Sequence, residues 1–461
     1  MFVINVGSLT RVPGLIGIAY HRGRRVIQPS GGMTLPRSIT TRPVRSPFQT
    51  LVLWCTCILV GVGASASLQA EDWPQRRGIG NNGISLETGW THDWPAEGPK
   101  VLWKGSVGIG FSGVVVGNGR AFTAGNSNGV DTIWGLDAST GQSLWSFSYT
   151  EALAPKMYEG GPNSTPTLDG NTLLVASKTG KLFRINASTG VVLWTNDLQV
   201  TVGPVLSDWG IACSPFVLAG RVYLNLGPSL VALDAESGKM FWRTEPEVKG
   251  KFSFTTPALL LQKETPYLLV HMHKALHTVN AATGKELRVH PFGRGYETHS
   301  SDPVIWDGSV FISSGDDGGE LLDFTPEGPS RRWKNKNLST FTGTAVVRDG
   351  MAYGVDSGGY RKGEQKLRCV DLATGKIRWS LDGFGQDSWI LAGDRLLLLR
   401  DSGEIQVIRV TPESGKIVAR AQVLGGKCWT QPSLANGLLY CRNARGSIVC
   451  LDLRASSDKV P

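Results

Sequence analysis

The stretch "LDASTGQSLW" at residues 136–145 recurs along the chain with small changes. Close copies are "INASTGVVLW" at 185–194, "LDAESGKMFW" at 233–242 and "VDLATGKIRW" at 370–379. The glycine of this motif returns every 40 to 49 residues, at Gly141, Gly190, Gly238, Gly284, Gly328, Gly375 and Gly415. A repeat of this length that contains only strand-like segments is typical of the blades of a β-propeller.

Each repeat divides into four short segments of apolar and β-branched residues that are separated by turn residues. In the third repeat these segments are "CSPFVLAG", "RVYLNLG", "SLVALDA" and "KMFWRTE". They predict four antiparallel strands for each unit. The composition agrees, because 461 residues with 58 glycines and only 18% charged residues are typical of a turn-rich globular protein. The predicted fold class is therefore all-β.

The repeated motif lies where a turn must join the third and fourth strands of each unit. Its acidic residue can accept hydrogen bonds from the backbone that follows it, as an Asx-turn does, at Asp137, Asp234 and Asp371. Its glycine can supply a positive φ angle, at Gly141, Gly190, Gly238 and Gly375. Its tryptophan begins the outer strand and can cover the gap between blades, at Trp145, Trp194, Trp242 and Trp379. Because some copies lack the tryptophan, such as "VTPESGKIVA" at 410–419, we interpret the motif as structural.

The two ends of the repeat region predict how the ring closes. The last repeat stops at "SIVCLDL" (448–453) without a fourth strand, whereas "KVLWKGSV" (100–107) is a fourth strand without its repeat. If the N-terminal strand completes the last blade, the chain forms eight four-stranded blades and leaves no open edge in the ring. The seventh blade, at about 386–424, has the least regular sequence. The propeller then spans 100–454, with an N-terminal extension at 71–99 and a C-terminal tail at 455–461.

Residues 1–70 have the pattern of a signal or targeting segment. Seven arginines and no acidic residue accompany the apolar run "LVLWCTCILVGVG" (51–63), and the small residues "ASASLQA" (64–70) follow it. The true start is Met1 or Met33, and the alternative to cleavage is an uncleaved anchor. We expect a periplasmic or secreted protein. Removing the seven arginines from the formal net charge of +9 leaves +2, so the charge gives no reason to expect nucleic-acid binding.

Cys441 and Cys450 lie on one expected hairpin, "LLYCRNARGSIVCLDL". In an oxidising compartment they can form a cross-strand disulfide. The alternative is that both are small buried residues on adjacent strands.

The repeated "LDAxTGxxxW" units resemble the PQQ-like repeat of the quinoprotein alcohol dehydrogenase-like propellers over roughly 100–454. The segment "DWPQRRG" (72–78) is similar to the mature start of secreted bacterial members. The superfamily includes pyrroloquinoline-quinone (PQQ) dehydrogenases and also cofactor-free scaffolds of the β-barrel assembly machine. For the dehydrogenases, the resemblance implies a vicinal Cys-Cys disulfide, a tryptophan floor, a calcium cage of Glu, Asn and Asp, and an Asp base. The sequence after residue 70 has no Cys-Cys pair.

Any chemistry must then use residues at the axis that do not repeat. Small polar strand starts, "NSTP" (163–166), "CSP" (213–215), "TTP" (255–257) and "SDP" (301–303), predict a ring that forms either a polar pocket or a hydrated channel. Glu159 and Asn163 form a possible calcium-type oxygen pair. Trp389 and Trp429 can stack on a flat cofactor or pack in the core. His271 and His273, or the residues of "YETHSSD" (296–302), could bind a metal ion or could be ordinary polar packing. We predict no metal site.

We therefore expect a monomeric binding or assembly scaffold without catalytic activity or cofactor. A protein partner or small ligand would bind on a propeller face, and only an uncleaved N-terminal segment would contact a membrane. The alternative is a dehydrogenase that uses PQQ and calcium to oxidise an alcohol or polyol. The catalytic residues, substrate and partner are not identified by the sequence.

Overall fold

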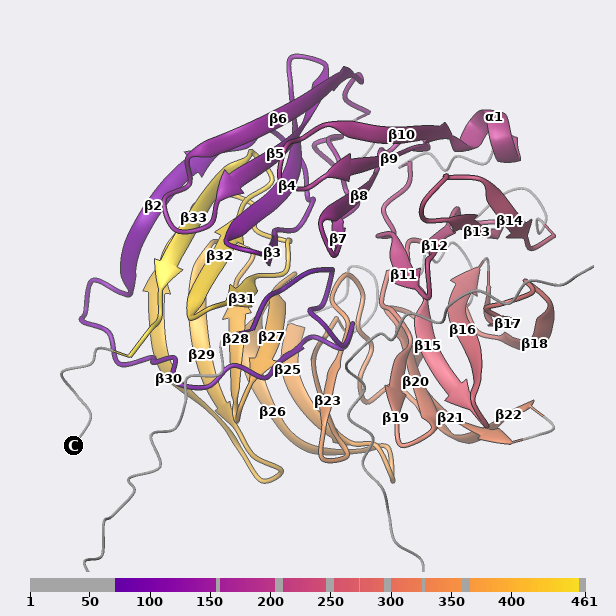
Figure 1. Cartoon of the computed structure of the whole chain (residues 1–461). Coiled ribbons are helices and arrows are strands. Elements are labelled where there is room, and N and C mark those ends of the chain that lie inside the picture. Colours follow the sequence, from indigo (N-terminus) through magenta and orange to yellow (C-terminus); the bar gives the residue numbers. More distant parts are fainter. Residues whose placement is uncertain are drawn as a thin grey trace, which may run out of the picture. The chain divides into compact units, whose positions relative to one another are not determined.

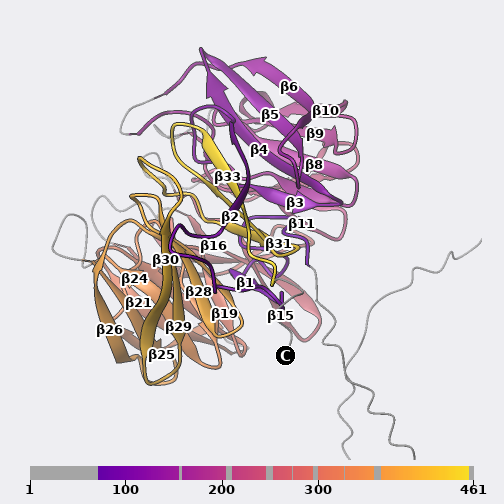
Figure 2. The same ribbon diagram turned by 90° about the vertical axis from the view of Figure 1, so that its left-hand side faces the viewer.

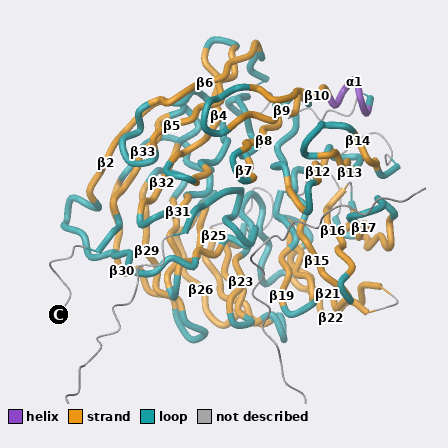
Figure 3. The backbone as a smooth tube through the Cα atoms, in the orientation of Figure 1, coloured by secondary structure: helices purple, strands orange, loops and turns teal. Residues whose placement is uncertain are grey.

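The computed structural model describes residues 71–154, 158–203, 210–245, 253–272, 274–293, 300–325, 328–357 and 365–455. The predicted signal segment at 1–70 lies outside these residues. Figure 3 shows that the described chain is strands joined by turns, with one short helix, α1 (Leu198–Val202). No helix in the described ranges is long and apolar enough to cross a membrane.

The strands of residues 100–452 form antiparallel four-stranded sheets, which are the blades of a propeller (Figure 1). Blade 1 contains β3 (Val115–Gly117), β4 (Arg120–Ser127), β5 (Val130–Asp137) and β6 (Ser143–Thr150). Blade 2 contains β7 (Thr167–Asp169), β8 (Thr172–Ala176), β9 (Lys181–Asn186) and β10 (Val192–Asp197). Blade 3 contains β11 (Phe216–Leu218), β12 (Arg221–Asn225), β13 (Leu230–Asp234) and β14 (Met240–Arg243). Blade 4 contains β15 (Ala258–Gln262), β16 (Thr265–Met272), β17 (Ala275–Asn280) and β18 (Glu286–Pro291).

The remaining blades complete the predicted count of eight in the described residues. Blade 5 contains β19 (Val304–Trp306), β20 (Ser309–Ser314), β21 (Gly318–Thr325) and β22 (Gly328–Asn335). Blade 6 contains β23 (Val346–Arg348), β24 (Met351–Asp356), β25 (Gln365–Asp371) and β26 (Lys376–Phe384). Blade 7 contains β27 (Ser388–Ala392), β28 (Arg395–Leu399), β29 (Glu404–Val410) and β30 (Gly415–Gln422). Blade 8 contains β31 (Ser433–Ala435), β32 (Leu438–Arg442), β33 (Ser447–Asp452) and β2 (Lys100–Ser106).

Blade 8 joins the two ends of the repeat region. β2 lies beside β33 (Figure 2). The two strands pair antiparallel, from Lys100 opposite Asp452 to Ser106 opposite Ser447. The irregular seventh repeat is a complete blade, and β1 (Ile84–Ser85) adds to it by pairing parallel with β27. The predicted eight blades are therefore present.

The tryptophans and glycines of the motif meet between neighbouring blades. A Cβ atom at Gly190 would lie 2.7 Å from the Trp145 ring of the preceding blade, and Gly141, Gly238, Gly284, Gly375 and Gly415 meet Trp103, Trp194, Trp242, Trp333 and Trp379 in the same way. The Trp145 indole donates a hydrogen bond to the Ala187 carbonyl at 2.9 Å, across the same gap. In the fourth repeat the tryptophan is replaced by Arg288, which lies beside Gly328. We call this set of contacts the outer ring.

The turn itself has the geometry of an Asx-turn. Asp137 Oδ1 accepts hydrogen bonds from the Ser139 and Thr140 backbone N–H groups at 3.0 and 2.8 Å. Equivalent bonds reach Asn186, Asp234, Asn280 and Asp371. Gly141 has φ +72° and Gly190 has φ +75°, a backbone region that side chains disfavour. The glycine therefore meets two demands, a positive φ angle and room for the neighbouring indole.

Of the two alternatives for Cys441 and Cys450, the structure contains the second, two small buried residues on adjacent strands, and no disulfide joins them. In the strand register Cys450 lies opposite Tyr440, while Cys441 lies opposite Val449. Successive side chains of a strand point to opposite faces, so this one-residue offset places the two sulfurs on different faces of the blade. Both are free, buried thiols.

Candidate ligand site at the propeller axis

The small polar residues at the strand starts are joined in a hydrogen-bonded ring around the axis. Each backbone N–H donates to the side chain at the equivalent position of the next blade. The bonds run from Gly113 to Thr165 Oγ1 (3.0 Å), Thr165 to Ser214 Oγ (3.1 Å), Ser214 to Thr256 Oγ1 (3.1 Å), Thr256 to Asp302 Oδ1 (2.8 Å) and Asp302 to Thr344 Oγ1 (3.0 Å). We call these contacts the inner ring. They bind blades 1 to 6 together, so these residues stabilise the ring in addition to lining its channel.

Residues 71–87 run into the centre of the ring, and we call this segment the plug (Figure 1). It begins at blade 1, where Trp73 and Val116 exchange backbone hydrogen bonds of 2.8 and 2.9 Å. It ends beside blades 7 and 8, where β1 pairs with β27 and Glu87 accepts from the Gly437 N–H at 2.7 Å. Glu71 accepts from the Leu86 N–H at 2.8 Å, which joins the two ends of the segment.

Two adjacent arginines hold the plug in the channel. Arg77 is 2% exposed, and its guanidinium donates to the carbonyls of Thr344 at 3.1 Å and Ala345 at 2.9 Å in blade 6. It also donates to the Asn82 carbonyl at 2.7 Å, within the plug. Arg76 forms an ion pair through Nη1 with the buried carboxylate of Asp302 in the inner ring. The plug therefore links blades that are far apart around the ring.

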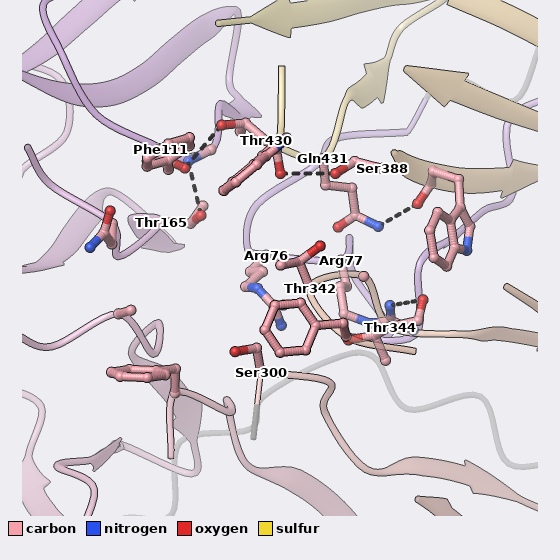
Figure 4. A pocket seen from close by; sticks show the side chains of 18 of the residues that line it. Arg76, Arg77, Phe111, Thr165, Ser300, Thr342, Thr344, Ser388, Thr430 and Gln431 are labelled. Atoms are coloured by element: carbon pink, nitrogen blue, oxygen red, sulfur yellow. Dashed lines mark hydrogen bonds between the residues drawn. The ribbon is translucent and has the colours of Figure 1, made fainter. Parts of the chain in front are cut away.

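A cavity of about 490 Å³ lies at the axis, and residues of the plug form part of its wall. The plug contributes Trp73, Arg76 and Arg77. Most other lining residues come from the loops that precede the innermost strands, and Figure 4 shows Arg76, Ser300 and Gln431 around the same space. A cavity of this size is in the range of small-molecule sites, which span about 300–1,000 Å³.

Aromatic rings from three blades meet at this cavity. Phe111 and Trp429 are stacked, with ring centroids 5.9 Å apart, and Tyr158 meets Trp429 edge-on at 5.3 Å. Lys427 lies 4.7 Å from the Trp429 ring centroid and pairs with Glu159 at 2.8 Å. Phe254 and Phe341 line the cavity as well. The wall thus combines apolar ring surfaces with polar side chains.

The structure brings together three of the four predicted cofactor residues. Asn163, Trp389 and Trp429 line the cavity, whereas Glu159 is not among its lining residues and is paired with Lys427. Trp389 is 2% exposed and packs closely on Gly343, so most of its surface is buried in the core. In this arrangement Glu159 and Asn163 do not share the cavity wall, and their action as a calcium-type oxygen pair stays a prediction.

The histidines weighed as metal ligands are placed only in part. His271 is buried and packs against the Phe292 ring at 5.5 Å. His273, Glu297 and His299 lie outside the described residues, while Asp302 accepts from Thr256 and Arg76. Within the described ranges, no three His, Cys, Asp or Glu side chains lie close enough to hold a metal ion.

Sequence reasoning missed the plug arginines and Phe111. The resemblance marked "DWPQRRG", but no periodic pattern indicates that this segment enters the channel. The available signal was a pair of arginines in an otherwise glycine-rich and polar stretch before the first strand. Burial lowers the pKa of Arg76 to about 10, so the group stays charged at neutral pH.

A family comparison supports the repeat assignment. The family described as "Outer membrane protein assembly factor BamB" matches residues 131–381. The BamB protein of Burkholderia pseudomallei is 27% identical over 357 residues, which cover 67% of this chain and 87% of the relative. The BamB protein of Yersinia pestis is 23% identical over 300 residues, covering 61% and 72%. The quinoprotein ethanol dehydrogenase of Pseudomonas putida is 22% identical over 295 residues, covering 56% of this chain but only 45% of the enzyme.

Solved structures share the fold at low sequence identity. BamB from Moraxella catarrhalis has a TM-score of 0.58 at 15% identity, covering 77% of this chain and 99% of that one. A europium-containing methanol dehydrogenase has a TM-score of 0.62 at 12% identity, covering 80% and 89%. Because the same fold occurs in an assembly factor and in an enzyme, it does not decide the function.

Proposed function

The chain belongs to the family of the outer membrane protein assembly factor BamB, and from this premise we propose that it is a non-catalytic scaffold that binds another protein. The names of its Burkholderia and Yersinia relatives describe factors for the assembly of outer membrane proteins. The expected signal segment at 1–70 is consistent with a protein that functions outside the cytoplasm. We therefore propose a periplasmic or secreted location.

A row of exposed apolar side chains on the outermost strands supports the scaffold function. Leu144, Leu193 and Phe241 hold the position before the motif tryptophan in blades 1 to 3, and they are 49%, 47% and 50% exposed. The row, which we call the apolar rim, contains Leu144, Val191, Leu193, Met240, Phe241, Leu287 and Val289. Large exposed apolar groups that recur on one side of a protein mark contact surfaces for other proteins. This observation carries the proposal.

The strands that carry the apolar rim are also free to pair. Each of β6, β10, β14 and β18 is the last strand of its sheet, so one row of its backbone groups makes no ladder with another described strand. An exposed strand edge beside apolar side chains suits a partner that lays an extended segment along it. We propose that the partner contacts the chain there.

The test compares two variants of the full chain, a double substitution in the apolar rim and a single control substitution outside it. Leu193→Glu combined with Phe241→Glu should abolish copurification of the partner from the natural host, because both changes place a charge in the apolar contact. Val200→Glu is the control, since Val200 is 83% exposed on α1 and does not belong to the rim. Both variants should unfold at the temperature of the wild type.

Two results would contradict the scaffold proposal. One is a wild-type chain that crosslinks to no other protein when a photoreactive residue replaces Leu193 or Phe241. The other is a partner that the Leu193→Glu, Phe241→Glu variant retains as well as the control does.

The residues at the axis do not fit the alternative, a PQQ- and calcium-dependent dehydrogenase. The expected calcium pair is split, because Glu159 is bound to Lys427 and only Asn163 faces the cavity. The carboxylate of Asp302 in the inner ring is engaged by Arg76 and by the Thr256 N–H.

A further inference from the structure

We propose that the axial cavity binds a neutral, polyhydroxylated small molecule, of the size of a mono- or disaccharide. This inference goes beyond the scaffold function and does not rest on it, because the apolar rim and the cavity are formed by different residues. It rests on three properties of the cavity: its uncommitted polar atoms, its charge balance and its aromatic wall.

Several polar atoms in the wall have no partner among the described residues. The Asn163 amide and the Ser300 hydroxyl line the cavity and make no hydrogen bond to another described residue. Gln431 uses its Nε2 to donate to the Trp389 carbonyl at 2.6 Å, which leaves its Oε1 as an acceptor. Among the described residues Arg76 bonds only to Asp302, through Nη1, which leaves its other N–H groups as donors. The cavity thus offers donors and acceptors side by side.

A hydroxyl group is the ligand group that matches such a mixed wall. It donates one hydrogen bond and accepts two, so neighbouring hydroxyls can satisfy an amide, a hydroxyl, a carbonyl oxygen and a guanidinium together. Buried polar groups that a ligand leaves unpaired would cost about 1–3 kcal/mol each. A ligand with several hydroxyls therefore suits these four side chains better than an apolar one.

The charges at the cavity cancel. The wall contains two arginines, Arg76 and Arg77, and one aspartate, Asp316, and Arg76 is paired with Asp302 of the inner ring. The formal charges of these four groups sum to zero, with Arg77 bound to the carbonyls of Thr344 and Ala345. The Lys427–Glu159 pair beside Trp429 is neutral as well. The balance favours a neutral ligand.

The aromatic rings supply the apolar part of the match. Phe111, Tyr158 and Trp429 form a contiguous cluster, and Phe254 and Phe341 add further ring surface. A sugar ring presents a face of C–H groups that packs on an aromatic ring, while its hydroxyls point outward to polar partners. Burying those C–H groups yields about 25 cal/mol for each Å² removed from water. The wall therefore fits a sugar ring in both respects.

The test measures binding of named sugars to the full chain by titration calorimetry and tryptophan fluorescence. The probes are glucose, galactose, N-acetylglucosamine, maltose and cellobiose, with gluconate and glucose 6-phosphate as anionic counterparts. At least one neutral sugar should bind with one-site saturation and a Kd of about 1 mM or lower. Quenching or shift of the tryptophan emission is expected, because Trp73, Trp389 and Trp429 line the cavity.

Two variants locate the site without disturbing the fold. Asn163→Leu and Ser300→Ala each remove a polar group that makes no hydrogen bond within the described part of the chain, so each should weaken sugar binding about fivefold to tenfold at an unchanged unfolding temperature. Thr132→Val is the control, because Thr132 pairs with Ser148 on the outer strands of blade 1. If Asn163→Leu does not fold, Ser300→Ala alone decides.

Three outcomes would overturn the inference. The first is that no sugar of the panel saturates the wild type up to about 10 mM. The second is that gluconate or glucose 6-phosphate binds more tightly than the neutral sugars, which would indicate an anion site. The third is that both variants bind like the wild type, which would place the sugar elsewhere on the molecule. Loss of the protein partner in the rim variant tests the scaffold function separately.

Discussion

At the scale of single residues, the motif glycine is limited by its neighbour as much as by its backbone. Gly190 has φ +75°, and its α-carbon faces the Trp145 ring so closely that a methyl group would collide with it. Gly170 has φ +58° but has open space around its α-carbon. The two glycines therefore separate the cost of the φ angle from the cost of the contact.

Gly190→Ala should destabilise the protein by about 2–4 kcal/mol, because it adds overpacking against Trp145 to the backbone penalty. Gly170→Ala should cost only about 1 kcal/mol, since only the backbone term applies. Urea unfolding followed by tryptophan fluorescence measures both. If the two variants lose the same free energy of unfolding, the close contact between Gly190 and the Trp145 indole does not explain the glycine.

Glu320 gives the fold a dependence on acid pH. The carboxylate is fully buried, and it contacts His290 Nε2 at 2.7 Å, Arg331 Nε at 2.6 Å and Lys334 Nζ at 3.5 Å. Burial alone would raise the pKa of Glu320, but the hydrogen bonds and charges of His290 and Arg331 outweigh it and hold the pKa below its ordinary value. The stability that this carboxylate contributes is present above its ordinary pKa and is lost as the pH falls through the lowered one.

Glu320→Gln should therefore lower the free energy of unfolding at pH 7 by about 1–3 kcal/mol. Below the lowered pKa the difference from the wild type should shrink, because the wild-type carboxyl is then protonated as well. Unfolding curves between pH 3 and 7 provide the measurement. Glu286→Gln is the control, since that carboxylate is 40% exposed and pairs only with His277 among the described residues. A difference that stays constant down to pH 3 would speak against the charge contribution.

At the scale of elements, the strand and blade pattern could be predicted because it repeats. Three features of the sequence predicted the eight blades and the pairing of β2 with β33. They are the alternation of apolar and polar residues along each segment, the spacing of 40–49 residues, and the two unpaired ends at 100–107 and 448–453. Register was not accessible in the same way. Cys441 and Cys450 are near each other in the hairpin, but a one-residue offset in pairing decides the face on which each sulfur lies.

The outer ring depends on the indole hydrogen bond as well as on packing, and two tryptophans separate these effects. Trp145 donates to the Ala187 carbonyl at 2.9 Å, while the Trp242 N–H is buried without a partner among the described residues. Both rings lie over a motif glycine, Gly190 and Gly284. Trp145→Phe should therefore cost about 1–2 kcal/mol more than Trp242→Phe, because only the first loses a hydrogen bond.

Thermal unfolding of the two variants checks this prediction, and Trp145→Ala, with an expected loss of about 3–5 kcal/mol, sets the scale for full removal of the ring. Equal costs for the two phenylalanine variants would show that the indoles stabilise the blades through packing alone.

At the scale of the whole propeller, three sets of contacts hold the blades together: the outer ring, the inner ring and the plug. The first could be predicted from a repeated motif, and the second in part from the repeated strand starts. The plug could not, because its segment occurs once and its partners, such as Thr344 and Asp302, lie more than 200 residues away in the sequence. Asn163, Trp389 and Trp429 belong to the repeats and could be predicted to lie near the axis, whereas Arg76 lies outside the repeats and could not.

Arg442 shows how the last blade is bound to the first. Its side chain is 1% exposed, and its guanidinium donates to the carbonyls of Gly108, Gly110, Ser112 and Ala124 at 2.8 to 3.0 Å. These carbonyls belong to blade 1 and to the loop that enters it. The ring is therefore closed by this arginine in addition to the pairing of β2 with β33.

Arg77 binds the plug to blade 6 through backbone carbonyls, as Arg442 binds blade 8 to blade 1. Its substitution tests whether the plug stabilises the whole propeller. Arg77→Met keeps the apolar stem but leaves the carbonyls of Thr344, Ala345 and Asn82 without their donor, so the free energy of unfolding should fall by about 3–5 kcal/mol. Arg420→Met, at an exposed position of β30, should change it by less than about 0.5 kcal/mol. If the plug is part of the cooperative fold, Arg77→Met lowers a single unfolding transition. If the variant instead loses protection from proteolysis only within residues 71–87 while the unfolding midpoint of the blades is unchanged, the plug is an appendage in the channel and the ring is stable without it.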